Sequence, residues 1–184
     1  MPNWCANCAT LTAKTPDQVA VLEKLVEAYD TNQPFMDILR PMPAHIYRGH
    51  LGEAERAKYG SNNWYDWSVD NWGCKWDANI ASYERDGDSI TVRFDSAWSP
   101  PVELYRYLVQ NGWGVDATYY EPGAGYCGVF ENGKDNYYNS PGGGFFEETV
   151  HGEMLDDEYN ILDQLEEMEM EEEYTGGFGP LFLY

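Results

Sequence analysis

The sequence predicts an α+β fold in which an antiparallel sheet carries two helices on one face. Short runs alternate apolar and polar residues, whereas two longer runs repeat apolar residues at helical spacing. These runs follow one another in the order β, α, β, β, α, β. The chain has 184 residues, of which 43% are hydrophobic, so it suffices for one compact domain with an extension.

The first strand is expected over residues 3–13, and the first helix follows it directly. Thr15 has the character of an N-cap, Pro16 suits the first helical position, and Gln18 completes a capping box. One apolar stripe then repeats at helical spacing and should pack on the sheet: Val19, Leu22, Leu25, Val26 and Tyr29.

Residues 31–62 are predicted to be an insertion after the first helix. Three prolines interrupt any long regular element there, although the run GEAERAKYG predicts one short helix. A further short helix is expected from about Asn63 to Asn71, ending near Gly73 and leading into a strand.

Two hairpins and a second helix complete the predicted domain. Strands over 76–83 and 89–97 flank the turn Asp86-Gly87-Asp88. Ser99-Pro100-Pro101 begins the second helix, which ends at Asn111-Gly112. A strand over 114–120 and a hairpin over 125–138 follow, with Asn132-Gly133 at its turn. This order is that of a ferredoxin-like sandwich over residues 1–140.

The composition changes after Ser140. Residues 141–151 contain Gly142-Gly143-Gly144 and are predicted to be a linker. Residues 152–184 are predicted to contain an acidic amphipathic helix, from about Gly152 to Tyr174, followed by an apolar C-terminus over 178–184. The apolar face of this helix is formed by Met154, Leu155, Tyr159, Leu162, Leu165 and Met168.

The charge distribution indicates what kind of partner the protein binds. The net charge is −21, and residues 151–184 carry 11 acidic residues and no Lys or Arg. Nucleic-acid binding is disfavoured, because such proteins need a cationic surface to release counterions. A basic protein surface is the more natural partner, since carboxylates about 5–6 Å apart on a helix have a spacing comparable to that of successive phosphates. The alternative is a solubilising tail.

The residues expected to contact such a partner all lie in the acidic segment. They are Asp157, Asp163, Glu166, Glu167, Glu171, Phe178, Leu181 and Phe182.

Three blocks of the sequence resemble a known family. They are Met1-Pro2-Asn3-Trp4-Cys5 with Asn7, the run from Asn71 to Asp77, and Ser96-Ala-Trp-Ser-Pro-Pro101. Together they are similar to the YubB ferredoxin-like proteins of conjugative plasmids and bacteriophages, over roughly residues 1–130. The resemblance implies a ferredoxin-like fold without an iron–sulfur cluster and an origin on a mobile element in a bacterial host. It implies no activity, and because Thr is common at the position of Cys74, it argues against a ligand role for this cysteine.

Four of the seven tryptophans fall in the stretch NWYDWSVDNWGCKW, residues 63–76. Burying four such rings would stabilise the fold by roughly 15–25 kcal/mol before costs, so most of them are expected in the core. The alternative is a groove that binds a nucleotide, another small ligand or a peptide. Its lining residues would be Trp64, Asp66, Trp67, Asp70 and Lys75.

Catalytic and metal-binding signals are weak. Asp66 and Asp70 are four residues apart on the expected helix, which would suit general acid–base chemistry or Mg²⁺, and this makes a metal-dependent enzyme a further alternative. Cys5 and Cys8 have C-x-x-C spacing, but residues three apart on a strand point to opposite faces. We therefore expect free thiols, no metal and no cofactor.

The leading hypothesis combines the charge distribution with the resemblance. The N-terminus lacks the basic region of a secretory signal, and no apolar run approaches the ~20 residues of a membrane span, so a cytoplasmic protein is expected. We expect a phage- or plasmid-encoded protein, not an enzyme, that binds and inhibits a host defence or nucleic-acid-binding protein.

Overall fold

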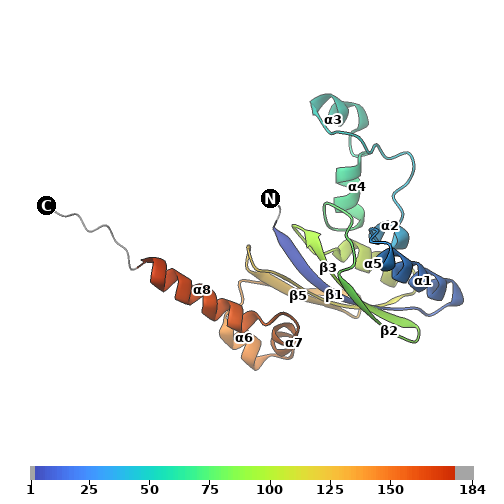
Figure 1. Cartoon of the computed structure of the whole chain (residues 1–184). Helices are drawn as coiled ribbons and strands as arrows, with labels where there is room; N and C mark the ends of the chain where they lie inside the picture. Colours follow the sequence, from blue (N-terminus) through green and yellow to red (C-terminus); the bar gives the residue numbers. More distant parts are fainter. Residues whose placement is uncertain (1–2, 177–184) are drawn as a thin grey trace. The chain divides into compact units, whose positions relative to one another are not determined.

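The computed structural model describes the backbone of residues 3–176 (Figure 1). The chain divides into two compact units, residues 1–140 and residues 141–184. The first unit contains the sheet and five helices, and three further helices belong to the described part of the second. The boundary coincides with the change in composition at Ser140, where the predicted domain ends.

A six-stranded antiparallel sheet forms the centre of the first unit, which confirms the α+β prediction. Its strands lie in the spatial order β2-β3-β1-β4-β5-β6. Their bounds are β1 Trp4–Thr12, β2 Ser82–Asp86, β3 Ser89–Ala97, β4 Gly114–Glu121, β5 Tyr126–Glu131 and β6 Lys134–Asn139. Strand β1 is central, because Asn7 pairs with Phe94 of β3 on one side and with Tyr119 of β4 on the other.

Five helices belong to the first unit: α1 Pro16–Asp30, α2 Met36–Leu39, α3 Glu53–Tyr59, α4 Trp64–Asn71 and α5 Val102–Gln110. Helices α1 and α5 lie on the same side of the sheet (Figure 1). Alternate residues of β1 are buried, and the apolar ones among them form one core cluster with Leu22 and Leu25 of α1 and with Leu104 and Leu108 of α5. The period-two pattern of β1 and the helical stripes therefore bury the same apolar layer.

The N-terminus of α1 follows the predicted capping pattern. Thr15 Oγ1 accepts a hydrogen bond from the backbone N–H of Gln18 at 3.3 Å, and Pro16 is the first helical residue. The Gln18 side chain accepts from the N–H of Lys14 at 2.6 Å, one residue before the N-cap. Two backbone donors at this helix end are thus satisfied by side chains.

The strand predicted over 76–83 is wrong in its first part, because β2 begins only at Ser82. The preceding segment pairs with the insertion instead. The Asp77 carboxylate accepts from the N–H groups of Met36 and Asp37, and the Phe35 N–H donates to the carbonyl of Ala78. These bonds hold residues 77–78 at the N-terminus of α2 and away from the β3 ladder.

The second unit differs from the predicted linker and single helix. It contains α6 Gly143–Glu148, α7 Val150–Tyr159 and α8 Ile161–Gly176. The break between α7 and α8 lies at Asn160, whose left-handed conformation (φ 53°, ψ 49°) Asn tolerates better than most residues. Side chains support the new helix start, since Asp156 accepts from the Leu162 N–H and Asn160 donates to Asp163. The predicted apolar end, residues 178–184, lies outside the described residues.

Candidate functional site

Helix α4 places the first part of the tryptophan stretch. Asn63 is its N-cap, and Asn63 Oδ1 accepts from the N–H groups of Tyr65 and Asp66 at 3.0 and 3.1 Å. The Asp66 carboxylate accepts in turn from the Asn63 side chain at 2.6 Å. Asp66 therefore closes a capping arrangement, which gives this predicted site residue a structural role.

The four tryptophans differ in burial. Trp72 is only 4% exposed, and Trp67 packs edge-on against it with ring centroids 5.2 Å apart. Trp64 is partly buried, whereas Trp76 is 39% exposed. Only Trp72 belongs to the buried core, and Trp67 packs against it. The expectation that most of these rings are core is therefore wrong for the exposed Trp76 and holds only in part for Trp64.

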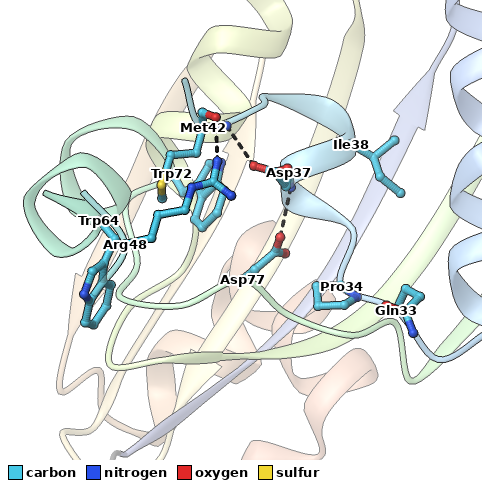
Figure 2. Close-up of a pocket in the computed structure, with 9 residues that line it drawn as sticks. All are labelled: Gln33, Pro34, Asp37, Ile38, Met42, Arg48, Trp64, Trp72 and Asp77. Carbon is cyan, nitrogen blue, oxygen red and sulfur yellow. Dashed lines mark hydrogen bonds between the residues drawn. The ribbon is translucent and has the colours of Figure 1, made fainter. Parts of the chain in front are cut away.

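A cavity of about 440 Å³ opens beside α2 and α4 (Figure 2). Its lining comes from α2, the segments around it, α4 and the residues that follow α4. The lining residues are Gln33, Pro34, Asp37, Ile38, Met42, Arg48, Trp64, Trp72 and Asp77. Of the five ligand-binding residues predicted from the sequence, only Trp64 is among them.

The two carboxylates of this cavity are already engaged by backbone groups. Asp77 accepts three N–H groups, from Met36 at 2.7 Å, Asp37 at 3.0 Å and Ala78 at 2.8 Å. Burial raises the pKa of Asp77 above its ordinary value, and the N–H groups oppose that rise. Asp37 accepts from the N–H of Met42 at 2.7 Å (Figure 2). Both carboxylates therefore stabilise the loop and helix α2 and are poorly placed for acid–base chemistry.

Arg48 is the one cation among the lining residues of this cavity. Its Nη2 donates to the carbonyl of Met42 at 2.8 Å, and no carboxylate of the described chain pairs with it. Beside the rings of Trp64 and Trp72, the cavity thus offers aromatic surface and a guanidinium with further donors. Such a lining suits a flat ring that carries hydrogen-bond acceptors.

The remaining predicted ligand-binding residues lie apart from this cavity. Lys75 places its ammonium 4.4 Å from the ring centroid of Trp76, a cation–π contact, and Asp70 is exposed on α4. Within residues 3–176, no three His, Cys, Asp or Glu side chains are arranged to hold a metal ion. The structure therefore does not gather Asp66 and Asp70 into a metal centre.

The C-x-x-C pair behaves as its strand position requires. Cys5 is buried and Cys8 is partly exposed on the opposite face of β1, and none of the four cysteines forms a disulfide. Burial raises the pKa of Cys5, that of Cys74 to about 12 and that of Cys127 to about 11. These three thiols are protonated near neutral pH and are poor nucleophiles or metal ligands.

Helices α7 and α8 form a second candidate site. Asp157, Asp163, Glu166 and Glu167 are all exposed on them, while Phe146, Leu155 and Ile161 are buried. Residues 141–184 contain no Lys or Arg to neutralise these acids. Of the other predicted partner-binding residues, Phe178, Leu181 and Phe182 and the side chain of Glu171 lie outside the described parts.

Comparisons with known proteins found no match to a family model, to a curated protein or to a solved structure. None of the helices in the described part of the chain is both long and apolar enough to cross a membrane.

Proposed function

We propose that the protein is a non-enzymatic interaction protein whose second unit presents carboxylates to a basic surface of a partner protein. The observation that carries the proposal is the exposure of Asp157, Asp163, Glu166 and Glu167 on helices α7 and α8 in a unit without Lys or Arg. The buried apolar side chains beneath them support a folded surface, in contrast to a solubilising tail.

The preferred partner is a nucleic-acid-binding protein. Carboxylates three or four residues apart on a helix are about 5–6 Å apart, which suits a row of Lys and Arg side chains spaced to contact phosphates. The charge of −21 would also accelerate the encounter at low ionic strength. Occupying that surface would inhibit the partner by nucleic-acid mimicry.

We further propose a ferredoxin-like fold for residues 4–121 and an origin on a phage or plasmid, with the partner a host defence protein in the bacterial cytoplasm. The spatial order β2-β3-β1-β4, with α1 following β1 and α5 joining β3 to β4, supports the fold. The origin and the defence role are supported by the three sequence blocks that resemble the YubB family.

A pull-down of bacterial lysate by the full-length protein tests this function. In the test variant, Asp157→Asn, Asp163→Asn, Glu166→Gln and Glu167→Gln remove four charges and keep the side-chain shapes. The matched control removes four exposed charges from the first unit, through Asp30→Asn, Asp86→Asn, Asp88→Asn and Asp116→Asn. The captured basic partner should disappear with the first variant and stay with the second. Equal capture by both variants would contradict the proposal.

A second candidate function is the binding of a small aromatic ligand. It is favoured by the cavity of about 440 Å³ that Trp64, Trp72 and Arg48 line together, a volume within the usual range for ligand sites. A nucleobase or similar ring would contact the tryptophans and accept from Arg48. Nucleosides and nucleotides should then change the tryptophan fluorescence, and Arg48→Gln should weaken the response. A flat titration with the unmodified protein would exclude this function.

A further inference from the structure

An exposed tryptophan and an unpaired carboxylate are neighbours on one face of the sheet. In the β1–β3 ladder, Trp4 pairs with Ala97 and Ala6 pairs with Asp95. Side chains alternate between faces along a strand, so these four residues share a face, and Trp4 and Asp95 are diagonal neighbours. The small Ala97 opposite Trp4 leaves room for the indole, whose ring centroid lies 6.4 Å from that of Trp76.

Trp4 and Asp95 line the same groove. Its volume is about 500 Å³, and its other lining residues are Asn32 and residues 77–81. The side-chain NH2 group of Asn79 donates both to the carbonyl and to the side-chain oxygen of Asn32, so its donors are already engaged. Lys and Arg are absent from the lining, which includes the acidic residues Asp77 and Asp95.

Neither the Asp95 carboxylate nor the ring of Trp4 contacts a Lys or Arg side chain of the described chain. No hydrogen bond or ion pair joins the Asp95 carboxylate to any residue of the described chain, and its pKa is raised by partial burial alone. Trp4 is 51% exposed, and within residues 3–176 no Lys or Arg lies over its ring. The neighbouring Trp76 differs, because the Lys75 ammonium lies 4.4 Å from the centroid of its ring. An open indole face thus lies beside a carboxylate that lacks a counter-charge.

We propose that this groove binds a small organic cation, a quaternary or methylated ammonium group, over the Trp4 indole with Asp95 as its counter-charge. Trp is the aromatic side chain that attracts such cations most strongly, and a nearby carboxylate adds direct charge attraction. Anions are repelled by Asp77 and Asp95. A neutral polyol is a poorer occupant, because the Asn79 amide already donates to Asn32. All lining residues of the groove belong to the first unit, so this proposal does not rest on the acidic surface of the second unit.

Calorimetric titration of the full-length protein with choline tests the site, and dimethylbutanol, the neutral carbon isostere of choline, measures the contribution of the charge. Choline should bind about ten-fold more tightly than the isostere. Asp95→Asn and Trp4→Leu should each weaken choline binding about five-fold or more, and Asp95→Asn should leave the isostere unaffected. Asp116→Asn, which removes an exposed charge from β4 of the same sheet, is the matched control and should change little.

Three results would overturn the proposal: equal affinity for choline and its isostere, no effect of Asp95→Asn, or stronger binding of a glucose probe than of choline. If Trp4→Leu fails to fold, as circular dichroism would show, Trp4→Phe replaces it. Phe keeps an aromatic face of weaker cation affinity, so choline binding should then be intermediate. Unchanged choline binding by a folded Trp4→Phe protein would argue against the indole as the site.

Discussion

Gly152 gives the sharpest test of whether the second unit acts as a folded surface. This residue is buried at the start of α7, and its N–H donates to Thr149 Oγ1 at 2.9 Å. A Cβ atom at this position would overlap the carbonyl oxygen of Phe145 and would lie 2.6 Å from the Cα of Phe146. Both contacts are backbone atoms, so Gly152→Ala must push α6 and α7 apart.

The expected cost follows from these contacts. Overpacking typically costs about 1–3 kcal/mol, and a clash with backbone atoms belongs at the top of that range. Phe146 is 2% exposed, and a fully buried Phe side chain contributes roughly 1.5–3 kcal/mol relative to an exposed one, so its complete release would raise the cost to about 5 kcal/mol. The charge of the unit does not change. Gly152→Ala therefore tests whether partner binding requires a folded acidic surface or only an acidic composition.

Hydrogen exchange measured by mass spectrometry on the full-length protein is the assay. A cost of about 3 kcal/mol corresponds to roughly 100-fold less amide protection in α6 and α7, with β1–β6 unchanged. The proposed partner should also be lost from the pull-down. Gly144→Ala is the control, because its Cβ would meet only the Glu148 carboxyl group, at 4.0 Å. Equal protection in the two variants would refute the packing argument, and capture of the partner by an unfolded unit would refute the need for a folded surface.

Two further predictions concern the first unit. Burial raises the pKa of Cys74 from 9.0 to about 12, so the unfolded chain loses this proton first and the free energy of unfolding should fall as pH rises from about 9 to 12. Urea unfolding should show a loss of about 2 kcal/mol from this thiol by pH ~10.5, and the same slope in Cys74→Ala would argue against it. In Asp77→Asn, the side-chain NH2 group would face a backbone N–H that now donates to the Asp77 carboxylate. Because two donors cannot bond to each other, we expect the free energy of unfolding, measured with denaturant, to fall by about 1–3 kcal/mol. Asp70→Asn on the exposed face of α4 should stay within about 0.5 kcal/mol, and equal stability of these two variants would contradict the capping role of Asp77.

Local signals were sufficient for much of the first unit. The Thr15 cap begins α1 where the sequence predicts it, and Asn63 does the same for α4. The predicted turns also hold, since Gly87 and Gly133 take φ values of +54° and +74° between their strands. These elements depend on residues within a few positions of one another, which is why a single sequence predicts them.

The predictions from sequence are wrong where contacts between residues far apart in the chain determine the structure. Asp77 bonds to N–H groups 40 and 41 residues away, and this contact overrides the strand pattern of 76–81. The glycines of 142–144 suggest a linker, yet α6 begins at Gly143 because the following residues pack within their unit. In the candidate cavity, Trp64 could be predicted because it lies in a stretch rich in tryptophan. Arg48 lies in the insertion, where no periodic pattern of residues marks it as part of a site.

The central position of β1 has a consequence for synthesis of the protein. Both ladder partners of β1 are made long after it, since Asn7 pairs with Phe94 and Tyr119. During synthesis on the ribosome, both edges of β1 therefore stay unpaired until most of the first unit has been made. A sheet assembled from such non-local pairs folds slowly, and its nascent strand is open to aggregation or to chaperones. Truncated chains that stop before β3 should accordingly be recovered as insoluble or chaperone-bound species.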